Sequence, residues 1–211
     1  DGCWPAVTKT DFHWDLPTRA VVQLPRLCPN IKEVYISSGM SSAELVGGLR
    51  GLAAARNLKA LNLSLWPEGA TAEHARGHTA EATAALAALG GLRRLDVRLN
   101  GVCPVALAAG AAGLLPAALQ ALTCLTSLEV SVGGRGPTMT VALGACPNSL
   151  LELTLGKDQP TGLAWVVGTL QAAHPMAGVT RLKLLGCALR GATAAGLQGL
   201  GNAWGLLDGT S

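Results

Sequence analysis

A six-residue pattern of apolar and polar positions recurs along most of the chain. Apolar residues occupy its first, fourth and sixth places, and the alternation from place four to place six is typical of a strand with one buried face. A weaker copy has threonine in place four, and it begins at Val7. Because consecutive copies start 24 to 34 residues apart, the pattern predicts repeated units. The six clear copies begin at Ile31, Leu58, Leu92, Leu125, Leu150 and Val179.

The stretches between the copies favour helices. Pro17 and Thr18 suit a helix start, so we expect a helix over residues 18–27. Ser41 with Glu44 three places later is a capping box, and it predicts a second helix beginning there. We expect equivalent helices in the later units, at residues 71–89, 105–122, 139–145, 163–173 and 193–203.

With strand copies alternating with helices, the chain resembles the leucine-rich repeat family over nearly its whole length. The unit lengths are similar to those of the irregular, helix-containing types, either ribonuclease-inhibitor-like or F-box-associated. The ninth place holds a residue typical of the family only at Asn100 and Cys187. The resemblance implies an α/β fold, namely a right-handed leucine-rich repeat solenoid with a curved parallel sheet on the concave side and helices on the convex side.

We interpret residues 1–211 as a single leucine-rich repeat domain of six clear repeats plus one weak N-terminal repeat, and leave open that it is a fragment of a longer chain. A hydrophobic content of 49% with 14% charged residues provides a continuous core and excludes disorder. The net charge of +3 does not by itself indicate a nucleic-acid partner.

The six cysteines show no zinc spacing, so we expect free thiols in a reducing compartment. Three of them precede strand copies, where a small side chain would be buried: Cys28, Cys124 and Cys146. We therefore expect an intracellular, cytoplasmic location, with an organelle or a cilium as alternatives.

Residues 101–127 contain no charge, so a membrane span has to be weighed. Pro104, Pro116 and the strand copies on both sides instead favour a helix packed among its neighbours, and we expect no membrane contact.

Little in the sequence points to chemistry. His74 and His78, with Glu73 and Glu81, are spaced to share one helix face, but no third ligand of a zinc site accompanies them. A solvated helix face is the simpler interpretation, and we expect no metal and no cofactor. No local motif marks a nucleophile with its base. We therefore expect neither enzymatic activity nor a small-molecule substrate.

The resemblance implies that the polar residues between the leucines project from the concave face. A basic centre there would adjoin an acidic strip, which suits a polypeptide partner of complementary charge. A merely soluble sheet face is the alternative. The candidate partner-binding residues are Lys32, Tyr35, Lys59, Asn62, Arg94, Asp96, Arg98, Glu129, Glu152, Arg181 and Lys183.

The predicted function is protein–protein interaction, as a scaffold or docking subunit of a larger assembly. Two alternatives stay open: the substrate-receptor repeat domain of an F-box-type ubiquitin ligase adaptor, and a structural subunit of a ribonucleoprotein or ciliary complex. Arg93, Arg94 and Arg98 could also contact RNA phosphates. RNA is a secondary prediction, because Tyr35 is the only aromatic residue among the candidates.

Overall fold

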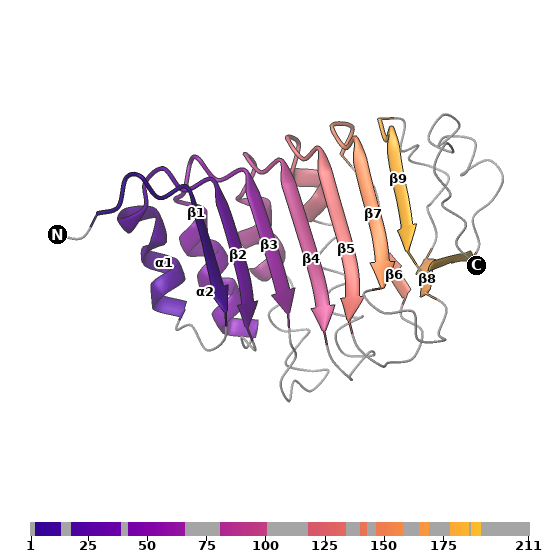
Figure 1. Ribbon diagram of the computed structural model, residues 1–211, viewed down its shortest axis with the longest axis horizontal. Helices are drawn as coiled ribbons and strands as arrows, with labels where there is room; N and C mark the ends of the chain where they lie inside the picture. The colour runs from indigo at the N-terminus through magenta and orange to yellow at the C-terminus, as the bar shows by residue number, and fades with distance from the viewer. Residues whose placement is uncertain are drawn as a thin grey trace.

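The protein is an α/β structure built on a parallel sheet (Figure 1). In the part of the chain that the structure describes, seven strands form this sheet in the order β1-β2-β3-β4-β5-β7-β9. Every neighbouring pair is parallel. The computed structural model describes residues 3–13, 18–38, 42–65, 81–100, 118–133, 140–142, 147–157, 165–168, 178–185 and 187–190.

Each strand of this sheet begins at the third place of a sequence copy. The weak copy is included, since β1 pairs with β2 along its full length. The strand predictions from the repeated pattern are therefore confirmed. The strands are β1 (Lys9–His13), β2 (Glu33–Ser38), β3 (Ala60–Leu65), β4 (Arg94–Asn100), β5 (Ser127–Gly133), β7 (Glu152–Lys157) and β9 (Arg181–Leu185).

The register aligns equivalent places of successive units. Leu61 lies beside Leu95, and Leu95 beside Leu128, so that aliphatic side chains of place four form a continuous row. These three leucines are at most 1% exposed. Place one is buried as well, from Ile31 to Leu150. The side chain of Leu182, in the same register row, lies outside the described residues.

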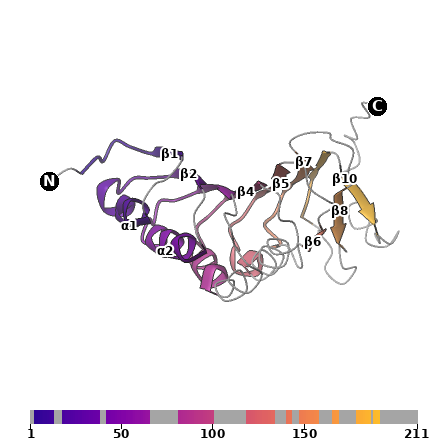
Figure 2. The ribbon, with the colours of Figure 1, turned by 90° about the horizontal axis from the view of Figure 1, so that it is seen from below.

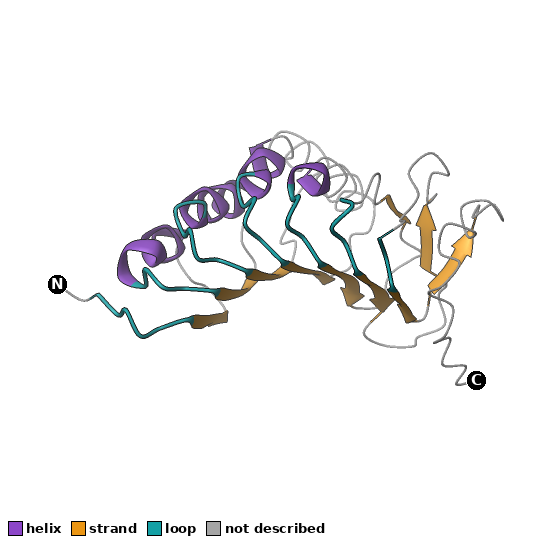
Figure 3. Cartoon of the chain, turned by 90° about the horizontal axis from the view of Figure 1, so that it is seen from above, coloured by secondary structure: helices purple, strands orange, loops and turns teal. Residues whose placement is uncertain are grey.

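Two helices are described in full, α1 (Thr18–Leu27) and α2 (Ser42–Leu52). Residues 81–87 and 118–121 are helical too. Figures 2 and 3 show these helices on one side of the strand row, and in Figure 3 the row bows toward them. The buried residues of the helices and strands form one hydrophobic cluster, to which α1 contributes Val21 and Leu24.

The helix predictions have different outcomes along the chain. The helix at residues 18–27 is confirmed, and the second begins at Ser42, next to the expected cap. Residues 81–87 and 118–121 confirm the ends of two further predicted helices. The remainder of these two, at 71–80 and 105–117, and all of 193–203 lie outside the described residues.

The predicted helices at 139–145 and 163–173 are wrong over the residues that the structure describes. These form strands β6 (Thr140–Ala142) and β8 (Trp165–Gly168), which join β10 (Cys187–Arg190) in a second parallel sheet. Two β-branched residues follow one another in β6 and again in β8, and such side chains fit a pleated strand better than a helix.

The cysteine expectations are only partly met. Cys28 is buried and Cys3 is exposed, and both are free thiols. Cys124 is also free but exposed, contrary to the prediction, while Cys146 lies outside the described residues. The difference follows from position, because Cys28 stands three residues before its strand copy and Cys124 stands only one residue before, in an exposed turn.

Candidate functional site on the free face of the sheet

The sheet has one face toward the helices and one face turned away from them, which we call the free face. Figure 1 looks onto the free face, with the helices behind the strands. Because side chains alternate along a strand, places three, five and seven project to this face, while places four and six enter the core. The free face therefore collects the polar residues that the repeated pattern places between the leucines.

Two register rows carry most of the charge on the free face. Alignment of the strands brings residues of the same place side by side. The row of place three consists of Lys9, Glu33, Ala60, Arg94, Ser127, Glu152 and Arg181. The row of place five consists of Asp11, Tyr35, Asn62, Asp96, Glu129, Thr154 and Lys183.

Nine of the eleven predicted residues lie in these strands. Lys32 and Lys59 instead lie in the turns directly before β2 and β3, where both are exposed. The Lys59 ammonium donates a hydrogen bond of 3.4 Å to the Gly91 carbonyl of the next turn. Of the predicted residues on the strands, three are exposed: Arg94, Arg181 and Lys183. Five others are partly buried: Tyr35, Asn62, Arg98, Glu129 and Glu152.

Two ion pairs connect neighbouring strands in the row of place three. The Lys9 ammonium lies 3.1 Å from the Glu33 carboxylate, and the Arg181 guanidinium donates to the Glu152 carboxylate. All four side chains keep 42% or more of their surface exposed. Pairs of this kind contribute about 0–1 kcal/mol, so they align neighbouring charges more than they stabilise the fold.

Asp96 is the exception among the charged residues of this face, because only 5% of it is exposed. The Asn62 amide donates a hydrogen bond of 2.7 Å to Asp96 Oδ2. The other carboxylate oxygen, Oδ1, is buried and has no hydrogen-bond partner. Asp96, which the sequence predicted to be a partner-binding residue, is therefore a buried carboxylate with one oxygen that lacks a hydrogen-bond partner.

The surroundings of Asp96 act on its protonation in opposite directions. Burial raises the pKa of the Asp96 carboxyl, and the Glu129 carboxylate beside it raises the pKa further. Arg98 and Arg94, two residues away on the same strand, lower the pKa, as does the hydrogen bond from Asn62. The sum is an upward shift, because removing the carboxylate from water outweighs the nearby positive charge.

The serines of place seven were not among the predicted residues. Ser37, Ser64 and Ser131 project to the free face by their register, yet each is buried. The Ser131 hydroxyl, like Asp96 Oδ1, has no hydrogen-bond partner. The signal was present in the sequence, because place seven, which selected Arg98 on β4, also selects Ser131 on β5.

Asparagines in the turns before the strands were also missed. The Asn30 amide donates to the Pro5 carbonyl at 2.9 Å, and the Asn57 amide donates to the Pro29 carbonyl at 3.1 Å. Each therefore satisfies a backbone group of the preceding unit. The family pattern drew attention to Asn100 for such a role, but the side chain of Asn100 lies outside the described residues.

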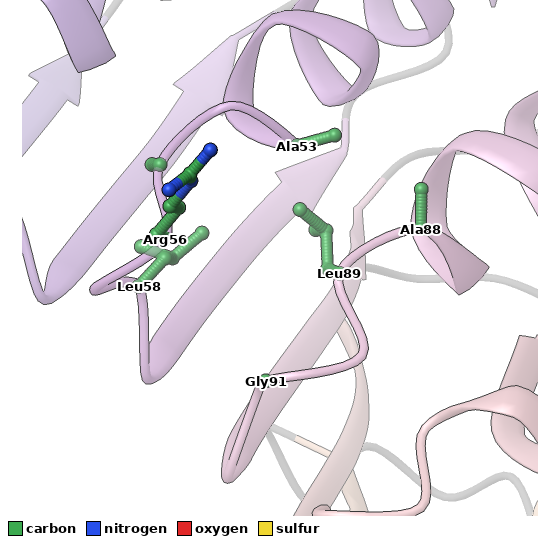
Figure 4. A pocket seen from close by; sticks show the side chains of 7 residues that line it. Ala53, Arg56, Leu58, Ala88, Leu89 and Gly91 are labelled. Carbon is green, nitrogen blue, oxygen red and sulfur yellow. The ribbon is translucent and has the colours of Figure 1, made fainter.

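A small pocket of about 110 Å³ opens between two of these turns (Figure 4). Arg56 is the only charged residue of its lining, which otherwise consists of Ala53, Ala55, Leu58, Ala88, Leu89 and Gly91. The lining therefore offers neither an acid nor a nucleophile. It is best described as a gap between successive units.

Within the described segments, no three potential metal ligands come together. The histidine pair of residues 74 and 78, with residue 73, lies outside them. No described helix combines the length and apolar character needed to cross a bilayer. Residues 101–117 of the uncharged run are not among those described, whereas Ala118, Leu119 and Leu122 are buried in the core.

The free face is thus the part of the described structure where polar side chains are gathered in a regular array. No protein-family model matches the chain, and neither a curated protein nor a solved structure is significantly similar to it.

Proposed function

We propose that the chain is a leucine-rich repeat solenoid of the right-handed, helix-containing kind, and that its free face binds a polypeptide. It would act as a scaffold or docking subunit of a larger assembly. The observation that carries the proposal is an ordered, charged sheet face that the described helices leave uncovered, held by backbone contacts that repeat from unit to unit.

The repetition of backbone contacts supports the solenoid. In six successive steps, the carbonyl oxygen of place two accepts hydrogen bonds from the N–H groups of places two and three of the next unit, at 2.8 to 3.0 Å. Lys32 does this for Lys59 and Ala60, and Lys59 does it for Arg93 and Arg94. Units that are joined through identical contacts are expected to stack as a quasi-one-dimensional array.

The turn before each strand repeats as well. The N–H of place one donates to the carbonyl three residues earlier, at 2.9 to 3.0 Å in five units. Leu92, for example, donates to the Leu89 carbonyl. This conserved geometry of the turn supports equivalent units of unequal length, because the additional residues of a longer unit lie elsewhere.

The charges of the free face support a polypeptide as the partner. Arg94 is exposed on β4, Glu129 stands on the adjacent β5, and Lys183 is exposed on β9, so both signs alternate over a short distance. Such a mixture fits a partner that also carries both signs. A nucleic acid would instead be favoured by one continuous basic surface with stacking aromatics, and Tyr35 is the only aromatic residue on the described strands of this face.

The test is a paired charge reversal with a matched control. The variant Arg94→Glu plus Arg98→Glu changes two arginines of the free face, whereas Arg50→Glu plus Arg56→Glu changes two exposed arginines of α2 and the turn after it. Both alter the net charge equally. Circular dichroism first establishes that each variant is folded.

Partners captured from source lysate are then identified and their affinities measured with the purified proteins. We expect the free-face variant to bind about tenfold more weakly, because it turns attraction into repulsion, while the control binds as the wild type does. Nuclease treatment should not change the recovery. Equal loss in both variants, or no loss in either, would contradict binding on the free face.

A further inference from the structure

We propose that Asp96, Glu129 and Ser131 form an acceptor site that binds an arginine side chain of the partner polypeptide. This inference rests on the proposed function, because it assumes that a polypeptide lies on the free face. The inference specifies one contact between the partner and the free face, and the residues of this contact differ from the exposed arginines beside them.

The register places the three acceptors next to one another. Asp96 on β4 pairs with Glu129 on β5, and Ser131 follows two residues later on β5, so that all three side chains project to the same face. The fourth corner is Arg98, which pairs with Ser131. The group lies on β4, the middle strand of the seven, and on the adjacent β5.

Two buried atoms of this group are unsatisfied. Asp96 Oδ1 and Ser131 Oγ both lack a hydrogen-bond partner, and both residues are at least nine-tenths buried, with 5% and 4% of their surface exposed. Among the described residues, the Glu129 carboxylate is not hydrogen-bonded or ion-paired either. Buried polar atoms in native proteins almost always have partners, so two orphans in one cluster indicate a missing group.

The missing group should donate hydrogen bonds and carry positive charge. Asn62 already occupies Asp96 Oδ2, and the pKa of Asp96 remains raised although Arg94 and Arg98 oppose the shift. The described residues therefore leave Asp96 Oδ1 and Ser131 Oγ without a donor, while burial and Glu129 disfavour the charged form of Asp96. A guanidinium provides five N–H donors in a planar fork and can reach separated acceptors, which an ammonium does less well.

A bare metal ion is a poorer fit. The described residues bring together only two carboxylates and one hydroxyl at this position, and they form no cluster of three metal-ligating side chains. Both orphan atoms are covered in the described structure, so a partner side chain reaches them only when neighbouring side chains change rotamer. Arg94 is exposed and Arg98 is partly buried, and rotation of such side chains is fast.

The test uses the full chain and a random peptide library displayed on phage. Selection on the wild type is followed by synthesis of the strongest peptide and of its arginine-to-glutamine analogue. Both are titrated against the wild type and against Asp96→Asn. This substitution keeps a carbonyl oxygen for Asn62 but places an amide donor where Oδ1 accepts.

We expect the selected peptides to share an arginine whose replacement weakens binding about thirtyfold, as for one partner of a buried charged hydrogen bond. Asp96→Asn should weaken binding of the arginine peptide similarly, with little further loss when both changes are combined. Glu81→Gln is the matched control, because Glu81 is an exposed carboxylate of a helix on the covered side of the sheet, where it pairs with Arg50. It should change the affinity less than about twofold.

Selected peptides without a basic residue would overturn the proposal. It would also be overturned if the losses of binding free energy from the peptide's arginine-to-glutamine change and from Asp96→Asn were additive. If such peptides nevertheless weaken with Arg94→Glu plus Arg98→Glu, the proposed function stands and only the arginine site fails. If no free-face substitution affects any selected peptide, both proposals fail.

Discussion

The two faces of the seven-stranded sheet differ in how strictly they repeat. On the covered face, place four is leucine or valine in five neighbouring strands, from Val34 to Leu153, and every one of these side chains is buried. On the free face, the adjacent row of place five changes from aromatic to amide to acid within the same strands. The residue type is therefore nearly constant along the covered face, whereas on the free face it changes from strand to strand.

The difference follows from what each face must do. A stack of units buries a shared core only if each unit offers an aliphatic side chain at the same place, and one polar residue there would leave an unsatisfied group in contact with both neighbours. The free face carries no such requirement. Its residues can therefore differ from strand to strand, and the burial of Asp96 shows that even this face contains positions with core-like surroundings.

The largest expected effect comes from breaking the covered face. Leu95 is fully buried between Leu61 and Leu128. Leu95→Asp places an unpaired charge in this row, and we expect the free energy of unfolding to fall by more than about 4 kcal/mol. Urea unfolding followed by circular dichroism measures the loss.

The control introduces the same residue on the free face. Ser127 lies between Arg94 and Glu152 in the register, so Ser127→Asp adds a carboxylate beside a guanidinium on one side and beside a carboxylate already paired with Arg181 on the other. The free energy of unfolding should change by no more than about 0.5 kcal/mol. If Ser127→Asp were as damaging as Leu95→Asp, the contrast between the faces would not hold.

A smaller effect is expected where two helices of the covered side touch. A Cβ atom on Gly51 would lie 2.5 Å from Val22 Cα, which belongs to the backbone of α1. Gly51→Ala should therefore push α1 and α2 apart and lower the free energy of unfolding by about 1–3 kcal/mol. Differential scanning calorimetry would detect the lower melting temperature.

Gly48, one turn earlier on α2, is the matched control. A Cβ atom there would meet Val21 Cγ1 at 3.4 Å, which is ordinary contact. Because alanine favours a helix over glycine by about 1 kcal/mol, Gly48→Ala should leave the stability unchanged or raise it. A loss of stability in Gly48→Ala equal to that in Gly51→Ala would mean that close helix packing is not the cause.

The covered face was the part that the sequence could predict. Strands and their register follow from a period of two residues repeated at each unit, and this signal is present in the weak copy at Val7 as well. The helices were less predictable, because two of the predicted ones are strands over the residues that the structure describes. At Val141 and at Val166, local β-propensity prevailed over the expectation that each unit contains a helix.

The state of individual residues on the free face was not predictable. Asp96 and Glu152 both stand at free-face places of the pattern, but one is buried and the other is paired and partly exposed. The difference depends on what lies across the strand, namely Asn62 and Glu129 for one and Arg181 for the other. These neighbours belong to other units, so the sequence of one unit does not predict whether its free-face residue is buried or paired.

The smallest expected effect concerns the protonation of Asp96. Its pKa in the folded protein is raised above the ordinary value of 3.8, chiefly by burial and then by Glu129. The folded state therefore binds the proton more tightly than the unfolded state. Ionisation of Asp96 lowers stability as the pH rises from 3.8 through the raised pKa, and the full penalty is present above that raised pKa.

Asp96→Asn removes this penalty while its carbonyl oxygen can still accept the hydrogen bond from Asn62. At pH 7 we expect the variant to be at least as stable as the wild type, whereas Glu152→Gln, which removes an exposed ion pair, should cost up to about 1 kcal/mol. As the pH falls through the raised pKa of Asp96, the advantage of Asp96→Asn should shrink, since the wild-type carboxyl becomes neutral as well. Urea midpoints of both variants and the wild type across this range measure the difference. An advantage that grows on acidification would mean that Asp96 is stabilised as a carboxylate, and the cluster on the free face would then have no shortage of positive charge.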